Sequence, residues 1–438
     1  MLQLLGFVGV LTLVLGVIHL YLWRRLVRDT LPAGRARRVM GFVVLGLALL
    51  VPATIIAPEP AAQWLAWVGY IWLAIMFYLL VLLAVLELPM LVARLWLRRR
   101  RSGVRAATAV PEPALVGAAS PAPPSAPALP PPAPAPPSQP APVASPAAAS
   151  PESPAAAPAG HDPDRRLLLA RGVAIFAGLT AAGLTGYGIP AALRTPVVDR
   201  VVIPLAKLDR RADGLRIALV SDIHLGPVLG RRSTERIVDV INGLDTDLVA
   251  VVGDLVDGTV EQLGPAAAPL RGLRSRYGSF FVTGNHEYYS GYEPWIDEVA
   301  RLGLRPLRNE RLEIIHRGAA LDLAGVNDVA GHDYGDGPDF ARALDGRDPS
   351  RPVVLLAHQP IQAFEAARYG VDLQLSGHTH GGQLVPFNLL VKLQQPVVTG
   401  LGTVDGTPVY VTDGAGFWGP PVRVGVPPEV TLVELRAP

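Results

Sequence analysis

The chain has 438 residues, of which half are hydrophobic and only 17% are charged, so its composition is more apolar than that of an ordinary water-soluble protein. Its formal net charge is only +2, which excludes the broad positive field of a general nucleic-acid-binding protein. It contains no cysteine, which excludes disulfide bonds, thiolate metal sites and cysteine nucleophiles.

Three apolar stretches near the start of the chain, 2–23, 39–57 and 64–86, are each long enough to cross a bilayer. A signal peptide is a competing interpretation of the first stretch, but its positive charges follow the apolar run instead of preceding it. Arginines are concentrated after the first and third stretches, and the positive-inside rule places both arginine-rich segments in the cytoplasm. We therefore predict a membrane region with three transmembrane helices over residues 1–101.

Pro, Ala and Ser dominate residues 102–163. A segment of this composition cannot bury a core and is typical of an extended, disordered linker. Recognition of its proline motifs by a partner domain is the alternative interpretation.

A fourth apolar stretch, 167–193, follows Arg165 and Arg166 and completes a segment predicted over 164–193. Its many small residues suit close helix packing in a membrane, which favours a fourth transmembrane helix. Paired arginines before an apolar run are also typical of a twin-arginine export signal. Both interpretations place the following residues outside the cytoplasm, and they differ in whether the segment is retained or cleaved.

From residue 197 onward, short apolar runs alternate with helical stretches and are separated by Gly- and Asp-rich loops. This alternation predicts an α/β domain over 197–438, in which ligands bind at the carboxyl ends of the strands. The predicted strands are 198–204, 215–221, 248–253, 279–283, 320–326, 353–357, 371–375, 408–412 and 430–435. The predicted helices include 234–244, 293–302 and 361–369.

Polar residues of the kinds that bind metal ions follow five of these strands. They are Asp222 and His224, then Asp254 and Asp257, then Asn285 with His286 and Glu287, then His358, and finally His378 and His380. Each fragment alone is more often explained by a turn or a helix cap than by a metal ligand. Five such fragments at strand ends of one domain favour a single shared site.

The blocks D-x-H, G-D-x-x-D, G-N-H-E, H and G-H-x-H occur in this order over residues 215–383 and resemble the calcineurin-like metallophosphoesterase family. The resemblance implies an α/β fold in which two β-sheets form a sandwich flanked by helices. Residues 284–289 and 416–423 also resemble a membrane-associated bacterial branch, which includes enzymes described as UDP-2,3-diacylglucosamine pyrophosphatases and twin-arginine-exported phosphoesterases.

The resemblance implies that the domain binds two divalent metal ions. Asp222, His224 and His380 would bind one ion, Asn285, His358 and His378 would bind the other, and Asp254 would bridge them. A mixed set of carboxylates and imidazoles favours Mn, Fe or Zn over Mg or Ca. Such a pair of ions lowers the pKa of a bound water, so that a hydroxide attacks, and neutralises charge on the phosphoryl oxygens.

Three further assignments concern residues beside the metal ligands. His286 has no metal role in the family pattern and resembles the histidine that contacts the phosphoryl group and protonates the leaving alkoxide. Asp257 and Glu287 are interpreted either as residues that orient the histidines or as loop caps. Arg423, within the 416–423 stretch, is a candidate contact for the substrate phosphate.

The function predicted is that of a membrane-anchored, metal-dependent phosphoesterase, multi-pass in the cell membrane, with its catalytic domain on the extracytoplasmic side. We expect it to hydrolyse phosphoester or phosphodiester bonds of phosphorylated small molecules or lipids. No nucleic acid is expected as a partner, because the domain lacks a basic, aromatic-interleaved stretch, and no protein partner is inferred.

Three alternatives remain at this point. The first is a pyrophosphatase acting on a nucleotide- or lipid-linked glycolipid such as UDP-2,3-diacylglucosamine, in lipid A biosynthesis, although the long linker between the spans and the domain argues against it. The second is a non-catalytic metal-binding module. The third is transport by the spans, for which His19 and Glu87 are the few ionisable residues available.

Overall fold

The computed structural model describes residues 2–56, 61–107 and 163–438. The chain divides into two compact units, one of Met1–Ala84 with Ala170–Pro438 and the other of Val85–Leu169. The described part of the second unit is the end of helix α3 (Ala61–Ala107) and the start of helix α4 (Pro163–Leu193). Helix α3 therefore includes the first residues of the predicted linker, and almost all of the remaining linker lies outside the described residues.

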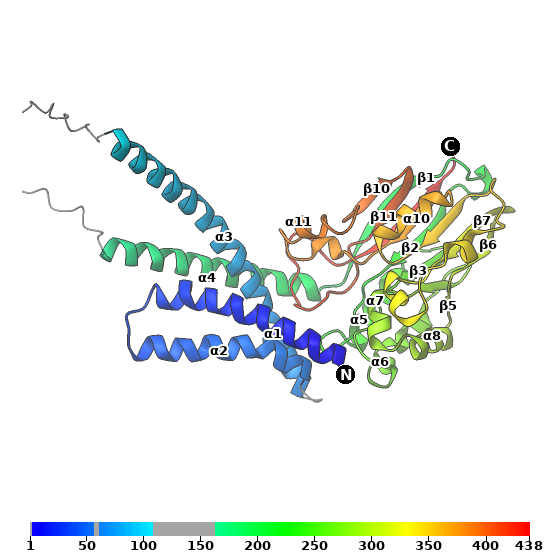
Figure 1. Cartoon of the computed structure of the whole chain (residues 1–438). Helices are drawn as coiled ribbons and strands as arrows, with labels where there is room; N and C mark the ends of the chain where they lie inside the picture. Colours follow the sequence, from blue (N-terminus) through cyan, green and yellow to red (C-terminus); the bar gives the residue numbers. More distant parts are fainter. Residues whose placement is uncertain (1, 57–60, 108–162) are drawn as a thin grey trace, which may run out of the picture. The chain divides into compact units, whose positions relative to one another are not determined.

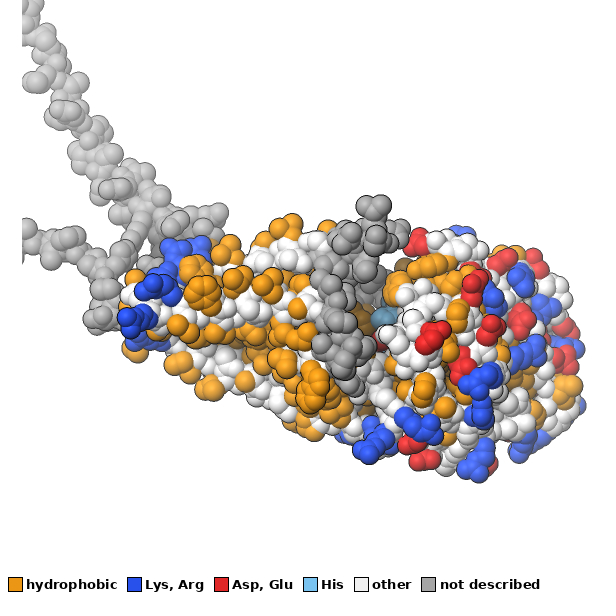
Figure 2. Space-filling model, turned by 90° about the horizontal axis from the view of Figure 1, so that it is seen from below, with side chains coloured by type: hydrophobic (Ala, Val, Ile, Leu, Met, Phe, Trp, Pro, Cys, Tyr) orange, Lys and Arg blue, Asp and Glu red, His pale blue; other side chains and the backbone are white. Residues whose placement is uncertain are grey.

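Four helices in the described part of the chain are long and apolar enough to cross a membrane. They are α1 (Leu2–Leu22), which continues as a π-helix over Trp23–Arg28, α2 (Arg35–Ile56), α3 and α4. Figure 2 shows hydrophobic side chains over much of the helical surface, in contrast to the mixed charges on the domain. Helices with apolar residues on their outer faces are typical of membrane spans. The predicted spans lie on these four helices, apart from residue 57, which lies outside the described residues.

His19, the ionisable residue within α1, contacts another apolar helix. Its Nδ1 lies 2.7 Å from the carbonyl oxygen of Leu15, and its Nε2 accepts a hydrogen bond from Trp72 Nε1 of α3 at 2.9 Å. Both ring nitrogens thus have partners, so His19 packs α1 against α3. The transport hypothesis gains no support from this residue.

The described residues 197–438 form two six-stranded sheets, drawn as two layers in Figure 1. The first has the order β1-β12-β2-β3-β4-β5 and consists of β1 (Val197–Pro204), β12 (Glu429–Arg436), β2 (Leu215–Val220), β3 (Leu248–Val252), β4 (Ser279–Val282) and β5 (Leu304–Pro306). The second has the order β10-β11-β9-β8-β7-β6 and consists of β10 (Gly400–Val404), β11 (Thr407–Val411), β9 (Leu373–Ser376), β8 (Val353–Leu356), β7 (Ala319–Gly325) and β6 (Glu310–His316). Strands β2 to β5 are parallel, as are β7, β8, β9 and β11, so each group has its carboxyl ends on one edge.

The two sheets pack face to face around the main core. Alternate side chains of β2 point to opposite faces: Ile217 and Leu219 enter the core between the sheets, whereas Ala218 and Val220 face the helices outside. Residues from β8 and β9 complete the inner core from the second sheet. Each large aliphatic side chain buried there contributes about 1.5–3 kcal/mol to stability, so the core holds the carboxyl ends of both sheets firmly in place.

Helices cover the outer face of each sheet. Helices α5 (Arg231–Asn242), α6 (Val260–Ala267) and α8 (Tyr292–Arg301) lie over the first sheet, and α9 (Phe340–Leu344) and α10 (Ala363–Arg368) lie over the second. Trp295 of α8, for example, is fully buried in the cluster that includes β3 and β4. The predicted α/β sandwich of two sheets flanked by helices is therefore confirmed.

The nine predicted strands are all present, with ends shifted by one or two residues, and three further strands were not predicted. The additional strands, β5, β6 and β10, all lie at sheet edges, where each has one neighbouring strand. Edge strands bury less of their surface, so their sequences carry a weak apolar alternation. In β10, glycines at Gly400 and Gly402 also hide the strand pattern.

Candidate metal centre

Five loops at the carboxyl ends of strands from both sheets meet at one place. The first sheet contributes Asp222 and His224 after β2, Asp254 and Asp257 after β3, and Asn285, His286 and Glu287 in helix α7 (Asn285–Ser290) after β4. The second sheet contributes His358 after β8, and His378 and His380 after β9. The structure brings six of the seven predicted metal ligands together in adjoining clusters. The seventh, Asn285, precedes His286, whose backbone N–H donates to Asp254 of these clusters.

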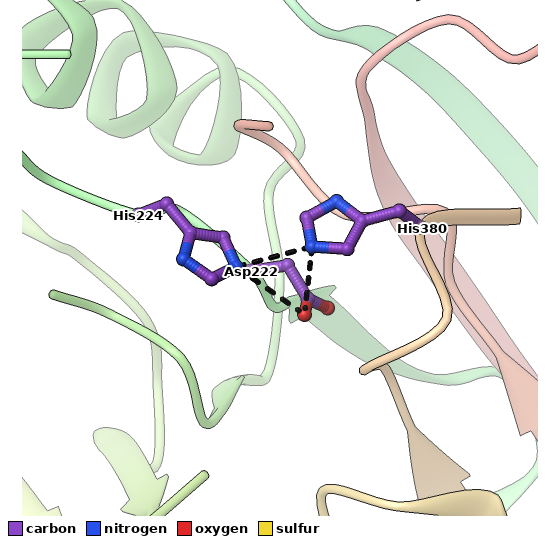
Figure 3. Close-up of side chains that lie close together, drawn as sticks. All are labelled: Asp222, His224 and His380. Carbon is purple, nitrogen blue, oxygen red and sulfur yellow. Dashed lines mark hydrogen bonds and ion pairs between the residues drawn. The ribbon is translucent and has the colours of Figure 1, made fainter. Parts of the chain in front are cut away.

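The first cluster consists of Asp222, His224 and His380, which converge from three directions in Figure 3. His224 Nε2 and His380 Nε2 lie 3.0 Å apart. Asp222 Oδ1 lies 3.4 Å from His380 Nε2 and 3.9 Å from His224 Nε2. The backbone N–H of His378 also donates to the Asp222 carboxylate, which ties the loop after β9 to the loop after β2.

The second cluster consists of Asp254, His358 and His378. Asp254 Oδ2 lies 3.2 Å from His358 Nε2, and His358 Nε2 lies 3.2 Å from His378 Nδ1. The same carboxylate oxygen is 3.7 Å from His224 Nε2 of the first cluster. Asp254 therefore lies between the two clusters, as a shared ligand would.

The spacing of these atoms fits divalent ions. Bonds of about 2.1 Å from one ion separate its neighbouring ligands by about 3 Å or slightly more, which is the range seen in both clusters. His224 Nδ1 contacts Asp257 and His358 Nδ1 contacts the carbonyl oxygen of Val252, so the Nε2 atom of each ring faces its cluster. The buried Oδ1 of Asn285 has no hydrogen-bond partner among the described residues, and a neutral acceptor of this kind suits a cation.

The pKa shifts of three histidines match this arrangement. Burial, together with the nearby charge of His358, lowers the pKa of His378 to about 3. Burial and the charges of His224 and Arg423 lower the pKa of His380 well below its usual range, so both imidazoles are neutral and able to ligate a metal. At His358 burial opposes the charged form, but the Asp254 carboxylate outweighs it and raises the pKa, which means that this pair attracts a positive charge between its two atoms.

The backbone is constrained at five of the seven predicted ligands. Asp222, His224, Asp254, His378 and His380 all have positive φ angles, between 48° and 72°. This conformation is uncommon for residues other than glycine and costs free energy. These positive φ angles are concentrated in three loops of one site. The surrounding structure therefore stabilises this backbone conformation, in which the five side chains point toward the site.

His286 is partly exposed, as is His378 among the predicted metal ligands. Its side chain is 18% exposed, whereas those of His224 and His358 are almost fully buried. Its Nδ1 lies 2.7 Å from Asp257 Oδ1, the oxygen that also contacts His224 Nδ1 at 2.9 Å. Burial opposes protonation of His286, but Asp254 and Asp257 outweigh it and raise its pKa to about 9. The ring is thus positioned at the partly exposed side of the centre, where it forms a third group of close-lying side chains with His224 and Asp254.

Glu287 is fully buried and holds two of the loops together. Its carboxylate accepts hydrogen bonds from the backbone N–H groups of Asp254, Leu255 and Gly284, at 3.0, 2.7 and 2.6 Å. These bonds join the loop after β3 to the loop after β4. These hydrogen bonds hold the backbone of Asp254 in place, and they are the contacts expected of a residue that caps a loop.

Arg423 is buried behind the first cluster. Its guanidinium donates to the carbonyl oxygens of Gly416 and Asp413, at 2.6 and 2.8 Å, and its Nη2 lies 3.1 Å from His380 Nδ1. The side chain therefore contacts its own loop and a predicted metal ligand. The contact with a substrate phosphate stays a prediction.

One residue of the site was missed in the sequence. Asp328 follows β7, is fully buried, and lies beside the site through a hydrogen bond of its backbone N–H to Thr283 Oγ1 and one from Gln359 Nε2 to its carboxylate. Its Oδ2 has no partner among the described residues, and burial raises its pKa. The sequence pattern that marks the other site residues is present here too, since Asn327 and Asp328 directly follow a predicted apolar strand.

Comparison with known proteins gives matches over the same region. Residues 215–382 match the family described as calcineurin-like phosphoesterase. A "Transmembrane protein with metallophosphoesterase domain" of Danio rerio is 40% identical over 272 residues, which cover 60% of this chain and 62% of the relative. The protein of the same name from Bos taurus is 40% identical over 289 residues, which cover 63% of this chain and 64% of the relative. The chain thus spans less than two thirds of the length of these two relatives.

A bacterial relative is matched over more of its length. An "Uncharacterized metallophosphoesterase" of Helicobacter pylori (strain J99 / ATCC 700824) is 40% identical over 276 residues, which cover 62% of this chain and 73% of the relative. The family match over residues 215–382 includes the loops that carry both clusters.

Proposed function

Because the chain belongs to the calcineurin-like metallophosphoesterase family, we propose that it is a membrane-anchored, dinuclear metal-dependent phosphoesterase. The observation that carries the proposal is the position of Asp254, whose Oδ2 lies within 4 Å of imidazole nitrogens of both clusters. The reaction is hydrolysis of a phosphomonoester or phosphodiester bond. The donor set favours Mn, Fe or Zn.

The residues of the two clusters would hold two divalent ions. Asp222, His224 and His380 would bind the first, Asn285, His358 and His378 the second, and Asp254 both. When bound, ions in these positions acidify a water molecule and neutralise charge on the phosphoryl oxygens. The carboxylate of Asp254 lowers the repulsion between two dications, and the neutral carbonyl oxygen of Asn285 adds a ligand without adding charge.

His286 is proposed as the general acid. Its ring forms a third group of close-lying side chains with His224 and Asp254, at the partly exposed side of the centre, where a leaving oxygen would emerge. Donation of the Nε2 proton to that oxygen prevents an alkoxide from forming, which contributes roughly 10²–10⁴-fold to such reactions. Asp257 accepts from Nδ1 of both His286 and His224, so one carboxylate orients a ligand and the acid together.

The membrane arrangement is proposed from charge. With the arginine-rich segments in the cytoplasm, residues 1–101 cross three times, 102–163 form a cytoplasmic linker, and 164–193 return to the other side. The catalytic domain, 197–438, is then extracytoplasmic. Its substrates are phosphorylated small molecules or lipids that reach the outer face of the membrane.

A pyrophosphatase acting on a glycolipid such as UDP-2,3-diacylglucosamine is the second candidate, and one observation favours it. The linker separates α3 from α4, whereas α4 ends at Leu193 and β1 begins at Val197. The domain is therefore tethered to the fourth span by three residues, and the earlier argument against presentation at the bilayer does not apply. This candidate uses the same metal ligands and the same acid.

The test uses the full-length protein in detergent, stripped of metal by a chelator and then supplied with Mn, Fe, Zn or Mg. We expect hydrolysis of bis-p-nitrophenyl phosphate or p-nitrophenyl phosphate to return with metal and to be lost in His378→Ala. His332→Ala, at an exposed histidine outside the clusters, is the matched control and should keep its activity. Full activity of His378→Ala would contradict the assignment.

A further inference from the structure

The segment that follows the last metal ligands exposes a group of large apolar side chains. We define the apolar segment as residues 385–393, which include helix α11 (Asn388–Val391). Its exposed apolar members are Val385, Phe387, Leu389, Leu390 and Leu393. Leu390 is 56% exposed and Leu393 is 83% exposed, which is unfavourable in water for side chains of this size.

The apolar segment lies directly on the metal centre. It begins five residues after His380, and the backbone of Asn388 packs against Gly382, where any side chain would collide with it. The short helix at His380–Gly382 and α11 are in direct contact. The environment that covers the apolar segment, whether lipid or protein, therefore also contacts the edge of the site.

The apolar segment is continuous with the candidate membrane spans. The ring of Phe387 lies 6.0 Å from the ring of Phe77 in α3, in an edge-on contact. Leu384, just before the segment, belongs to the same apolar cluster as residues of α1, α3 and α4. The backbone N–H of Arg423 donates to the carbonyl oxygen of Gly188 in α4 at 3.0 Å, which ties the neighbouring loop to the fourth span.

These contacts lie at two depths of the candidate spans. Gly188 is close to the end of α4 that faces the domain, since α4 stops at Leu193. Phe77 lies near the middle of the candidate span Trp64–Leu88, about 20 Å along the helix from Trp64. The apolar segment thus begins beside the domain end of α4, and Phe387 reaches the apolar depth of α3.

Two neighbouring residues have the chemistry of a membrane–water interface. Trp418 is exposed and is joined to the base of the segment through Gln383, whose amide oxygen accepts from the Trp418 N–H. Lys392 is exposed among the leucines. Tryptophan and lysine favour this depth because each has an apolar body and a polar end.

We propose that the apolar segment is inserted into the bilayer leaflet on the domain's side, beside α3 and α4, and holds the metal centre at the lipid–water interface. A bilayer accounts for all the observations, since it covers leucines that no described residue covers. A consequence, which depends on the proposed function, is that a phosphorylated lipid of that leaflet reaches the centre without leaving the membrane.

The absence of cysteine in the chain makes the insertion directly measurable. Leu390→Cys and Leu393→Cys carry a nitroxide label in the full-length protein, reconstituted in nanodiscs of phosphatidylethanolamine and phosphatidylglycerol. Ile315→Cys is the matched control, because Ile315 is 58% exposed on β6, at the far edge of the second sheet. We expect the labels at 390 and 393 to be relaxed by oxygen and protected from a water-soluble nickel chelate, and the label at 315 to behave oppositely. Equal access of the chelate to all three labels, as for a site that binds a soluble protein, would overturn the proposal.

The consequence for substrates is tested with the double variant Leu390→Asp and Leu393→Asp, with Ile315→Asp as control. We expect hydrolysis of phosphatidylglycerol in vesicles to fall by about tenfold or more, and that of a soluble nitrophenyl phosphodiester to be unchanged. Turnover of the soluble substrate alone by the unaltered protein, or equal loss of both activities, would overturn the consequence. Failure of the unaltered protein on both substrates would refute the proposed function, while the label measurement would still decide the insertion.

Discussion

Asp254 Oδ2 lies 3.2 Å from His358 Nε2, although the two residues follow strands of different sheets. The Nδ1 of His358 is engaged by the carbonyl oxygen of Val252, so the nitrogen that faces the carboxylate carries a lone pair in the neutral ring. Two electron-rich atoms at this distance require a positive charge between them. A proton on His358 supplies that charge, as its raised pKa indicates, and a divalent ion would replace the proton in the proposed centre. The same contact joins the two sheets at this edge.

His286→Gln is expected to leave both metal ions bound but to slow the chemistry. Because the general acid matters most for a poor leaving group, kcat should fall roughly 10²–10⁴-fold for an alkyl phosphoester and much less for a nitrophenyl ester. The measurement is kcat for both substrates together with the metal content. Equal losses for the two leaving groups would contradict the role of His286 as an acid.

Asp257→Asn is expected to change the pH profile. His286 can act as an acid only while protonated, so activity is lost as the pH rises through its pKa. The Asp257 carboxylate raises that pKa, and its neutralisation lowers it. The alkaline limb of kcat should therefore move to lower pH.

The same variant should also weaken metal binding, by about 10–100-fold, because His224 loses its orienting partner. Metal titration followed by isothermal calorimetry measures this effect. An unchanged alkaline limb and unchanged affinity would show that Asp257 is only a loop residue.

Gly377→Ala tests the close packing of the loops after β2 and β9. A Cβ at Gly377 would collide with Ser221 Oγ and with the carboxylate of Asp222. Displacement of a ligand by about 1 Å costs roughly 10²-fold in rate, so we expect a loss of this order. Gly230→Ala is the control, since no atom lies within 4 Å of a Cβ there, and it should retain activity. Similar activities of the two variants would exclude this steric role.

Arg423→Lys separates the two roles open to the buried guanidinium. A lysine cannot replace the donors to the carbonyl oxygens of Gly416 and Asp413, so the free energy of unfolding should fall by about 2 kcal/mol or more. Thermal unfolding and metal titration measure this, with KM for a soluble substrate unchanged. A raised KM at unchanged stability would instead support a phosphate contact.

The sequence was sufficient for the strands that carry the site. Strands β2, β3, β4, β8 and β9 are buried on both faces, so their sequences are rich in apolar residues, and the ligands directly follow them. The edge strands β5, β6 and β10 lack such runs of apolar residues and were not predicted, whereas the edge strand β1 was predicted. Asp328 was missed although it follows β7 in the same way, because the family blocks contain no acidic residue at that position.

Other features depend on contacts distant in sequence and could not be predicted. The burial of Arg423 behind His380 results from the fold of the 413–426 loop against the site, and no local pattern distinguishes it from an exposed phosphate contact. The short connection between α4 and β1 could have been predicted from the sequence, since only three residues separate Leu193 from Val197. The predicted order of segments already places the linker before the fourth span, so its length separates only the first three spans from the domain.

The most direct test of the account is the number of metal ions per chain in the full-length protein and in Asp254→Asn, with Asp239→Asn, at an exposed position of α5, as control. Inductively coupled plasma mass spectrometry should find close to two Mn, Fe or Zn ions in the unaltered protein and in the control. In Asp254→Asn we expect one ion or none. Activity should fall by more than about 10²-fold, because a loss of about 10²-fold is the most that is usual for a residue that only orients a ligand. Two tightly bound ions and full activity in Asp254→Asn would contradict the bridging role on which the proposed function depends.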